Sequence, residues 1–138
     1  MNISARVVNR HMQHQVLLKT GEHEHSLLIA PKPDGFGSSA NGGELLFLAL
    51  ATCYCNDIYR EARKRGLVIQ SVEVEVTGEF GGEGEPARNI RYRSSVEADA
   101  PREEVLDLMR YTDSVAEIQN TLRRSTDIAL TDCEVRGA

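Results

Sequence analysis

Three cysteines, Cys53, Cys55 and Cys133, are the side chains of this 138-residue sequence that are best suited to do chemistry. An odd number of cysteines in a chain that we expect to be cytoplasmic argues against a disulfide scaffold and leaves thiol chemistry open. Cys53 and Cys55 fall on a predicted helix, where residues two apart point about 200° away from each other. They can therefore neither form a disulfide nor chelate a metal ion together, so each thiol is considered alone.

Two interpretations of Cys53 are open at this point. Free cysteine is among the most buried residue types, so a small core residue is the simpler interpretation. A reactive cysteine needs a lowered thiol pKa. Cys53 lies about three helical turns beyond Asn41, where the effect of the helix dipole has faded. A cation from elsewhere in the fold is therefore required to lower the pKa of this thiol.

A long helix carries the first two cysteines. Asn41 can cap its N-terminus, with Glu44 three residues later, and Gly66 suits the position after its last residue. We therefore expect the helix over residues 42–65. Its first half, residues 45–51, is apolar on every face. Because such a helix is buried on all sides, we expect a sheet on one side of it and a partner subunit on the other.

Shorter elements surround this helix. We expect strands at residues 3–8, 15–19 and 23–29, a loop at 30–40, strands at 68–80 and 90–98, a helix that opens at Pro101, a second short helix at 114–123 and a last strand at 128–135. Helices and strands do not alternate strictly in this order. The pattern therefore predicts an α+β fold with antiparallel sheets, in a single domain over residues 1–138.

The charge balance excludes several partners. Sixteen Lys and Arg against 21 Asp and Glu give a formal net charge of −5. Without a long basic run, the chain is a poor candidate for nucleic acid or for an anionic membrane surface. The longest apolar-rich run, residues 45–55, is far shorter than the roughly 20 residues that span a bilayer. Nothing at the N-terminus resembles a signal peptide, so we expect a cytoplasmic protein.

Histidines and a basic run are the remaining candidates for a functional site. The four histidines lie in the N-terminal strand region, at positions 11, 14, 23 and 25. A metal site would need a third ligand, and no cysteine is near in sequence, so we expect no metal and no cofactor. The basic run at residues 60–65 is interpreted as a solvated end of the long helix.

Three segments resemble the OsmC/Ohr family. The first is the central helix with its approach, GSSANGGELLFLALATCYCNDIYREARKRGL, and the second is the alternating strand VEVEVTGEF. The third, VAEIQNTLRR, is similar to the segment Cys-Pro-x-Ser-Asn-Thr-Leu of many relatives. The resemblance implies an intertwined homodimer with two long helices in the middle and sheets outside. It also implies a thiol peroxidase for organic hydroperoxides.

The resemblance assigns roles to two residues. Cys53, which precedes the aromatic Tyr54, matches the peroxidatic cysteine whose thiolate attacks the O–O bond and becomes a sulfenic acid. Arg10 is the best match to the arginine that stabilises this thiolate, with Arg6 as the alternative. A guanidinium at hydrogen-bonding distance favours a thiolate and can also polarise a peroxide oxygen.

Three positions depart from the family pattern. Ala116 stands where the resolving cysteine is expected, and Glu117 stands where a proline usually follows it. Gly43 stands where the family has the glutamate that orients the arginine. Glu44 is one place away, which on a helix is a rotation of about 100°. We therefore interpret Glu44 as the partner of the Asn41 cap.

Two functional hypotheses follow. In the first, the chain reduces organic hydroperoxides with Cys53 as nucleophile, and an external thiol or dithiol resolves the sulfenic acid, ahead of Cys55 or Cys133. Cys133, on the predicted last strand, is expected to fill the core. In the second hypothesis, the chain is not an enzyme and holds a small apolar ligand at the dimer interface. The lost positions Gly43 and Ala116 motivate this alternative.

Overall fold

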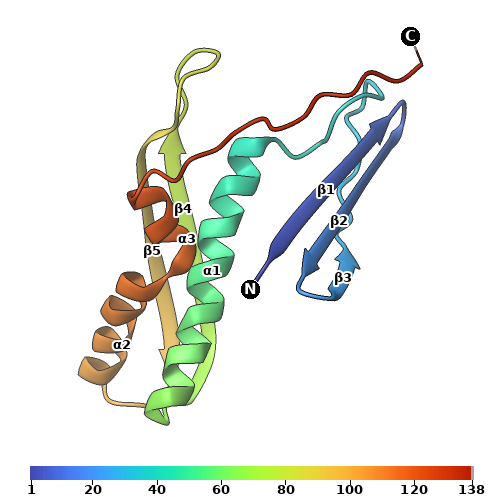
Figure 1. The fold of residues 1–138 in the computed structure, drawn as a ribbon. Coiled ribbons are helices and arrows are strands. Elements are labelled where there is room, and N and C mark those ends of the chain that lie inside the picture. The colour runs from blue at the N-terminus through green and yellow to red at the C-terminus, as the bar shows by residue number, and fades with distance from the viewer. Residues whose placement is uncertain (138) are drawn as a thin grey trace. The chain divides into compact units, whose positions relative to one another are not determined.

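The computed structural model describes residues 1–137 and confirms the α+β class (Figure 1). The elements are β1 (Ile3–Arg10), β2 (Gln13–Thr20), β3 (His23–Ser26), α1 (Gly42–Arg65), β4 (Ile69–Glu79), β5 (Arg88–Ala98), α2 (Arg102–Val115) and α3 (Glu117–Arg123). The chain falls into two compact units, Met1–Leu46 and a second that begins at Phe47. No helix among residues 1–137 is long and apolar enough to cross a membrane.

The central helix α1 has the predicted bounds because both of its ends are capped by local contacts. The Asn41 side chain accepts a hydrogen bond from the Glu44 N–H at 2.7 Å, and the Glu44 carboxylate accepts one from the Asn41 N–H at 2.9 Å. This is the capping box that the sequence predicts. At the other end the N–H groups of Gly66 and Leu67 donate to the carbonyls of Arg63 and Ala62, as in a Schellman motif.

We expect the substitution Gly66→Ala to destabilise the fold by about 1 kcal/mol, because Gly66 has φ +69° and only glycine adopts this conformation without cost. An added Cβ would meet no atom within 4 Å, so the effect is purely conformational. Urea denaturation measures it. The control is Gly42→Ala, which also meets no atom within 4 Å but lies inside α1, where alanine is the better residue. Equal effects of the two substitutions would contradict this account of the cap.

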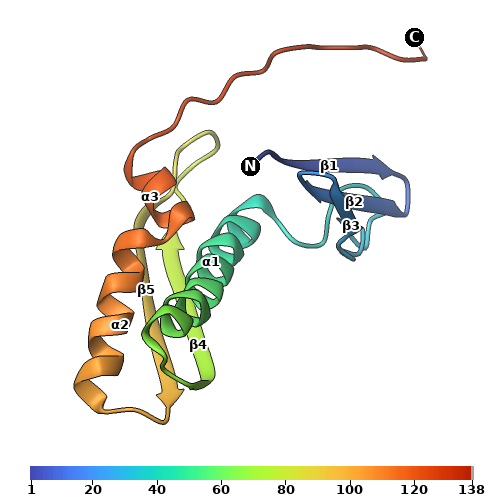
Figure 2. The same ribbon diagram turned by 60° about the horizontal axis from the view of Figure 1, so that its bottom comes forward.

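The second unit packs helices on one face of the β4–β5 hairpin (Figure 2). Tyr54, Ile58 and Ala62, at four-residue spacing on α1, form a buried cluster with Leu108 of α2. The partly buried side chains packed against this cluster include Ile69, Val72, Val74, Tyr92 and Val96 of the two strands. The opposite face of the hairpin is polar and exposed, as the alternation of the sequence predicts.

The N-terminal unit is a three-stranded antiparallel sheet in the order β1-β2-β3, with the predicted turn at Gly21 between β2 and β3. Val7 pairs with Val16, and Ala5 pairs with Leu18, so these apolar side chains share one face of the sheet. Val16 is the only buried hydrophobic residue of this unit, and Val7 is exposed. The sheet therefore has an apolar face without a core of its own.

Two predictions on the C-terminal part are wrong. Residues 128–135 form no strand, and Ile128, Leu130 and Cys133 are exposed, so Cys133 does not fill the core. Alternating side chains are not sufficient for a strand, which also needs a neighbouring edge to bond its backbone groups. The expected helix at 114–123 is instead the end of α2 and a separate α3, divided at Ala116, whose backbone is extended.

Candidate functional site

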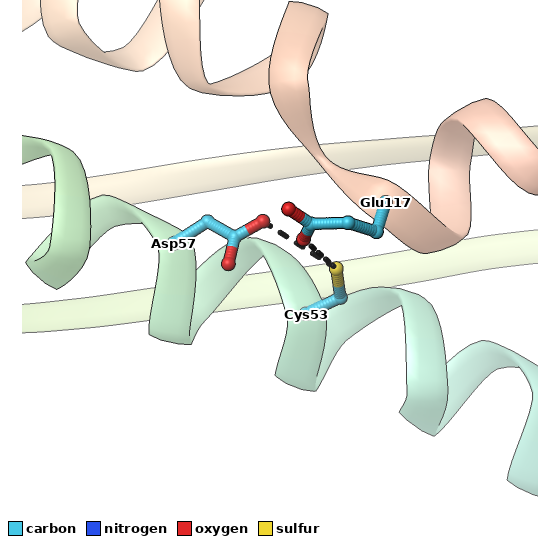
Figure 3. Close-up of side chains that lie close together, drawn as sticks. All are labelled: Cys53, Asp57 and Glu117. Atoms are coloured by element: carbon cyan, nitrogen blue, oxygen red, sulfur yellow. Dashed lines mark hydrogen bonds between the residues drawn. The ribbon is translucent and has the colours of Figure 1, made fainter. Parts of the chain in front are cut away.

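Cys53 and Asp57 lie one turn apart on α1, so both side chains project from the same face of the helix. The Cys53 thiol donates to Oδ2 of Asp57 at 3.5 Å. Oε1 of Glu117, the first residue of α3, lies 3.7 Å from the same sulfur. Figure 3 shows both carboxylates directed toward Cys53. The half-buried free thiol is therefore in contact with two carboxylates.

The break between α2 and α3 explains why Glu117 reaches the cysteine. Ala116 is fully buried at this break, and Glu117 follows it directly. Gln119 ties α3 to the central helix, since its Nε2 donates to the carbonyl of Leu50 at 3.0 Å. The start of α3 is thus fixed against α1 one turn before Cys53.

Arg60 holds the two carboxylates in place. Its Nη1 lies 3.1 Å from Oδ1 of Asp57 and 2.9 Å from Oε2 of Glu117. Its Nε contacts Oε2 of Glu61 at 2.7 Å, and Lys64 contacts the same oxygen at 3.1 Å. The interpretation of residues 60–65 as a solvated helix end is therefore wrong for Arg60, which is part of an ion-pair network around the cysteine.

This environment favours the neutral thiol. Burial raises the pKa of Cys53, and the charges of Asp57 and Glu117 raise it further, while the N–H of Ile118 acts in the opposite direction. The nearby charges are thus the reverse of those that activate a thiolate. A group that removes the thiol proton, or a cation from another part of the assembly, is needed for reactivity near neutral pH.

The two carboxylates differ in basicity. Burial, and then the hydrogen bond and charge of Glu117, raise the pKa of Asp57 to about 6. Burial also opposes ionisation of Glu117, but hydrogen bonds from protonated Asp57, from the Glu117 backbone N–H and from Arg60 outweigh it and hold the pKa of Glu117 below its ordinary value. Asp57 is therefore the stronger base of the pair.

The same side chains form a possible metal-ligand set. One ligand atom from each of Cys53, Asp57 and Glu117 lies within 4.8 Å of the other two. A thiolate with two carboxylates suits a divalent ion such as zinc. Arg60, however, already pairs with one oxygen of each carboxylate, and its permanent positive charge opposes a second cation at the same place. The geometry therefore favours an ion-pair network over a metal centre.

The two residues predicted for catalysis lie in different units. Cys53 is on α1 in the second unit, half-buried. Arg10 ends β1 in the N-terminal unit, where it is exposed and lies opposite Gln13 in the strand register. The role of Arg10 as activator stays a prediction. Cys55 is also free and half-buried, and Glu44 is bound to the Asn41 cap as expected.

Sequence reasoning missed Asp57, Glu117 and Arg60. Asp57 could have been found, because it lies four residues after Cys53 on the predicted helix and both side chains therefore share one face. Glu117 was noted only as a replacement for proline. Its contact with Cys53 spans 64 residues of sequence and depends on how α3 packs, so no local signal announces it.

Solved structures with this fold come from several bacteria. An OsmC-like protein from Mycoplasma pneumoniae is 17% identical with a TM-score of 0.60, and 91% of each chain is covered. An organic hydroperoxide resistance protein from Elizabethkingia anophelis is 17% identical with a TM-score of 0.58, covering 91% of this chain and 90% of that one. The organic hydroperoxide resistance protein OhrB of Bacillus subtilis is 17% identical with a TM-score of 0.53, covering 90% of this chain and 93% of that one. These similarities establish the fold, and the comparison with curated proteins gives no significant match.

The α+β order of this chain, with a long helix and antiparallel sheets, is the fold of these solved structures. The family model of OsmC-like proteins matches residues 35–131, which is most of the chain. The protein therefore belongs to the OsmC-like family, and the resemblance noted in the sequence is confirmed.

Proposed function

We propose that the protein is a thiol-dependent peroxidase that reduces organic hydroperoxides, with Cys53 as the nucleophile. The observation that carries this proposal is the position of the Cys53 sulfur. It is free, half-buried and within 3.7 Å of two carboxylates, whereas a cysteine that only fills a core lies among hydrocarbon side chains. Relatives of the same fold are described as hydroperoxide resistance proteins, which supports the choice of substrate class.

The proposed reaction has two stages. The Cys53 sulfur attacks one oxygen of the hydroperoxide, the O–O bond breaks, and the products are a sulfenic acid and an alcohol. An external thiol then attacks the sulfenic acid to give a mixed disulfide and water, and a second thiol, the other one of a dithiol, attacks the mixed disulfide, releases the Cys53 thiol and leaves as the external disulfide. An internal thiol is a poor candidate for this step, because Ala116 has none and Cys55 projects from a different face of α1.

Arg10 is the proposed activator of Cys53. The charges that surround the thiol in its own unit are carboxylates, and they raise its pKa. A guanidinium placed beside the sulfur would counter them and would also polarise the peroxide. Arg10, at the end of β1, is the best match to the arginine of the family, and Arg6 on the same strand is the alternative.

The proposed assembly is a homodimer. The apolar face of the β1-β2-β3 sheet carries exposed Ile3 and Val7, and Leu48 on the apolar half of α1 is 54% exposed. A three-stranded sheet with one buried side chain lacks the core that independent stability requires. A second copy of the chain supplies matching apolar surfaces. Sedimentation equilibrium should give twice the chain mass of 15.3 kDa, and a stable monomer would contradict this assembly.

Steady-state turnover tests the proposed activity. The full chain is mixed with cumene hydroperoxide and either dithiothreitol or dihydrolipoamide, and the remaining hydroperoxide is measured. We expect consumption that depends on both protein and dithiol and that stops after the cysteines are alkylated. If hydroperoxide were lost no faster with the protein than in protein-free buffer, for both dithiols, the result would argue against the proposal.

A second candidate function is binding of a small apolar ligand. A cavity of about 210 Å³ has three aliphatic lining residues, Leu50, Ile90 and Leu122, and three polar ones, Tyr92, Arg123 and the buried Gln119. Oε1 of Gln119 has no hydrogen-bond partner among the described residues. This cavity suits a short aliphatic chain that carries one hydrogen-bond donor. Saturable binding of a medium-chain alcohol by a protein with unreactive thiols would favour this alternative.

A further inference from the structure

Arg60 fixes which oxygens of the two carboxylates face the cysteine. Its guanidinium contacts Oδ1 of Asp57 and Oε2 of Glu117. The other oxygen of each carboxylate, Oδ2 and Oε1, is the one directed at the Cys53 sulfur. The arrangement presents two proton-accepting oxygens to one thiol. A peroxidase reaction at this thiol has to remove one proton from sulfur and deliver one proton to the departing alkoxide.

Two observations distinguish Asp57 from Glu117. The Asp57 side chain is only 8% exposed and comes from the same helix as Cys53, whereas the Glu117 side chain is 61% exposed. Burial makes the Asp57 carboxylate the better proton acceptor, because a carboxylate with a raised pKa is the stronger base. Hydrogen bonds from protonated Asp57, from its own backbone N–H and from Arg60 hold the pKa of Glu117 below its ordinary value, so Glu117 is the weaker base.

We propose that Asp57 is the catalytic proton carrier of Cys53, and that Arg60 and Glu117 position it. As sulfur attacks the hydroperoxide, the S–H proton passes to Oδ2 of Asp57 and the O–O bond breaks. The protonated Asp57 then gives this proton to the departing alkoxide, which leaves as an alcohol. Sulfur is oxidised by two electrons, the hydroperoxide is reduced by two, and Asp57 returns to its ionised form. This inference rests on the proposed peroxidase function.

The proposal predicts a specific pH profile. The charged and titratable groups that face Asp57 are Cys53 and Arg60 on α1 and Glu117 on α3. Asp57 must be ionised to accept the proton. The rate of Cys53 oxidation should therefore rise with pH, bend near pH 6, where Asp57 titrates, and then level off. Removal of the Glu117 charge should move this bend to lower pH, because Glu117 raises the pKa of Asp57.

A purely electrostatic role for Asp57 predicts the opposite sign. If its charge only opposed ionisation of the thiol, loss of the charge would lower the pKa of Cys53 and speed its oxidation at neutral pH. If Asp57 carries the proton, loss of the carboxylate slows oxidation by about 100-fold, at the lower end of the usual effect of a general base. The sign of the change therefore decides between the two roles.

The experiment follows oxidation of Cys53 by cumene hydroperoxide in stopped flow from pH 5 to pH 9, in a chain that also carries Cys55→Ser and Cys133→Ser. Asp57→Asn is compared with the parent, and Glu117→Gln is the matched carboxylate control. We expect Asp57→Asn to be about 100-fold slower at pH 7 and to lose the bend near pH 6. Glu117→Gln should keep a bend, at lower pH. An Asp57→Asn variant as fast as its parent at pH 7, or faster, would overturn the proposal.

Two further readouts keep the outcomes distinct. If Asp57→Asn melts at a much lower temperature than its parent, its rate says nothing about proton transfer. The pH profile of the parent is then the test, and the absence of a bend between pH 5 and pH 7 overturns the proposal. If the parent does not react with hydroperoxide at any pH, the proposed function fails. Alkylation of Cys53 by iodoacetamide then tests proton transfer alone. A bend near pH 6 in the alkylation rate that is lost in Asp57→Asn supports proton transfer from Cys53 to Asp57. An alkylation profile that the substitution leaves unchanged overturns this role of Asp57.

Discussion

Replacing Cys53 by serine is expected to lower dithiol-dependent turnover of organic hydroperoxides to below about 1% of the parent rate. Loss of the nucleophile should slow the reaction by a factor of about 10² or more. The serine hydroxyl is nearly isosteric with the thiol but is a poor nucleophile toward an O–O bond. Because Cys53 is half-buried beside charged groups, the substitution should leave the fold intact. The measurement is the initial rate of cumene hydroperoxide loss with dihydrolipoamide, together with a melting curve.

The other two cysteines provide matched controls for this prediction. Cys55 projects from a different face of α1, and Cys133 lies in the exposed segment after α3. Cys55→Ser and Cys133→Ser should each keep more than half of the parent rate, a change of about 0.4 kcal/mol or less in activation free energy. If one of the controls lost turnover and Cys53→Ser kept it, the nucleophile would be that other cysteine and not Cys53.

Replacing Ile58 by alanine is expected to destabilise the protein by about 3 kcal/mol, within the range of 2–5 for such substitutions in a core. Ile58 is fully buried in the cluster of Tyr54, Ala62 and Leu108 that joins α1 to α2. A loss of this size is a large fraction of the stability of a typical domain. The melting temperature should fall on the order of 10 °C.

Val68, an exposed residue just before β4, is the control for Ile58. Val68→Ala also removes apolar carbon atoms but should change stability by no more than about 0.5 kcal/mol. All variants are melted at one protein concentration, because association raises the apparent stability of a dimer. A loss under 1 kcal/mol for Ile58→Ala would mean that α1 and α2 do not share the core described here.

Much of the fold was predictable because its signals are local. The bounds of α1 follow from a capping box at Asn41 and a glycine at position 66, both of which act within a few residues. The alternation of Val72, Val74 and Val76 against glutamates gave β4 and its buried face. These elements were predictable because each carries its own boundary residues and its own hydrophobic period.

The remaining features depend on distant contacts and were not predictable in the same way. Residues 128–135 have the alternation of a strand but no strand edge beside them in the described chain. The surroundings of Cys53 depend on α3, which brings Glu117 to the sulfur from 64 positions away. Arg60 looked like a solvated charge until Asp57 and Glu117 were placed against it. In all three cases distant contacts, or their absence, override what the local sequence indicates.

We propose that the two carboxylates act on the Cys53 thiol in addition to the proposed activator Arg10. A cation lowers the pKa of a thiol in advance of the reaction, whereas a carboxylate removes the proton during it. The departure at Glu117, where a proline usually stands, places a charged group within reach of the sulfur. Because Ala116 carries no thiol, we propose that an external thiol performs the resolving step.

The central claim is that Cys53 becomes a sulfenic acid when it meets an organic hydroperoxide. The most direct measurement treats the protein with one equivalent of cumene hydroperoxide at neutral pH in the presence of a dimedone-type trap, followed by peptide mass spectrometry. The account predicts a trap adduct on Cys53 in most of the protein and little or none on Cys55 or Cys133. Three unmodified thiols after complete exposure to the peroxide would contradict it.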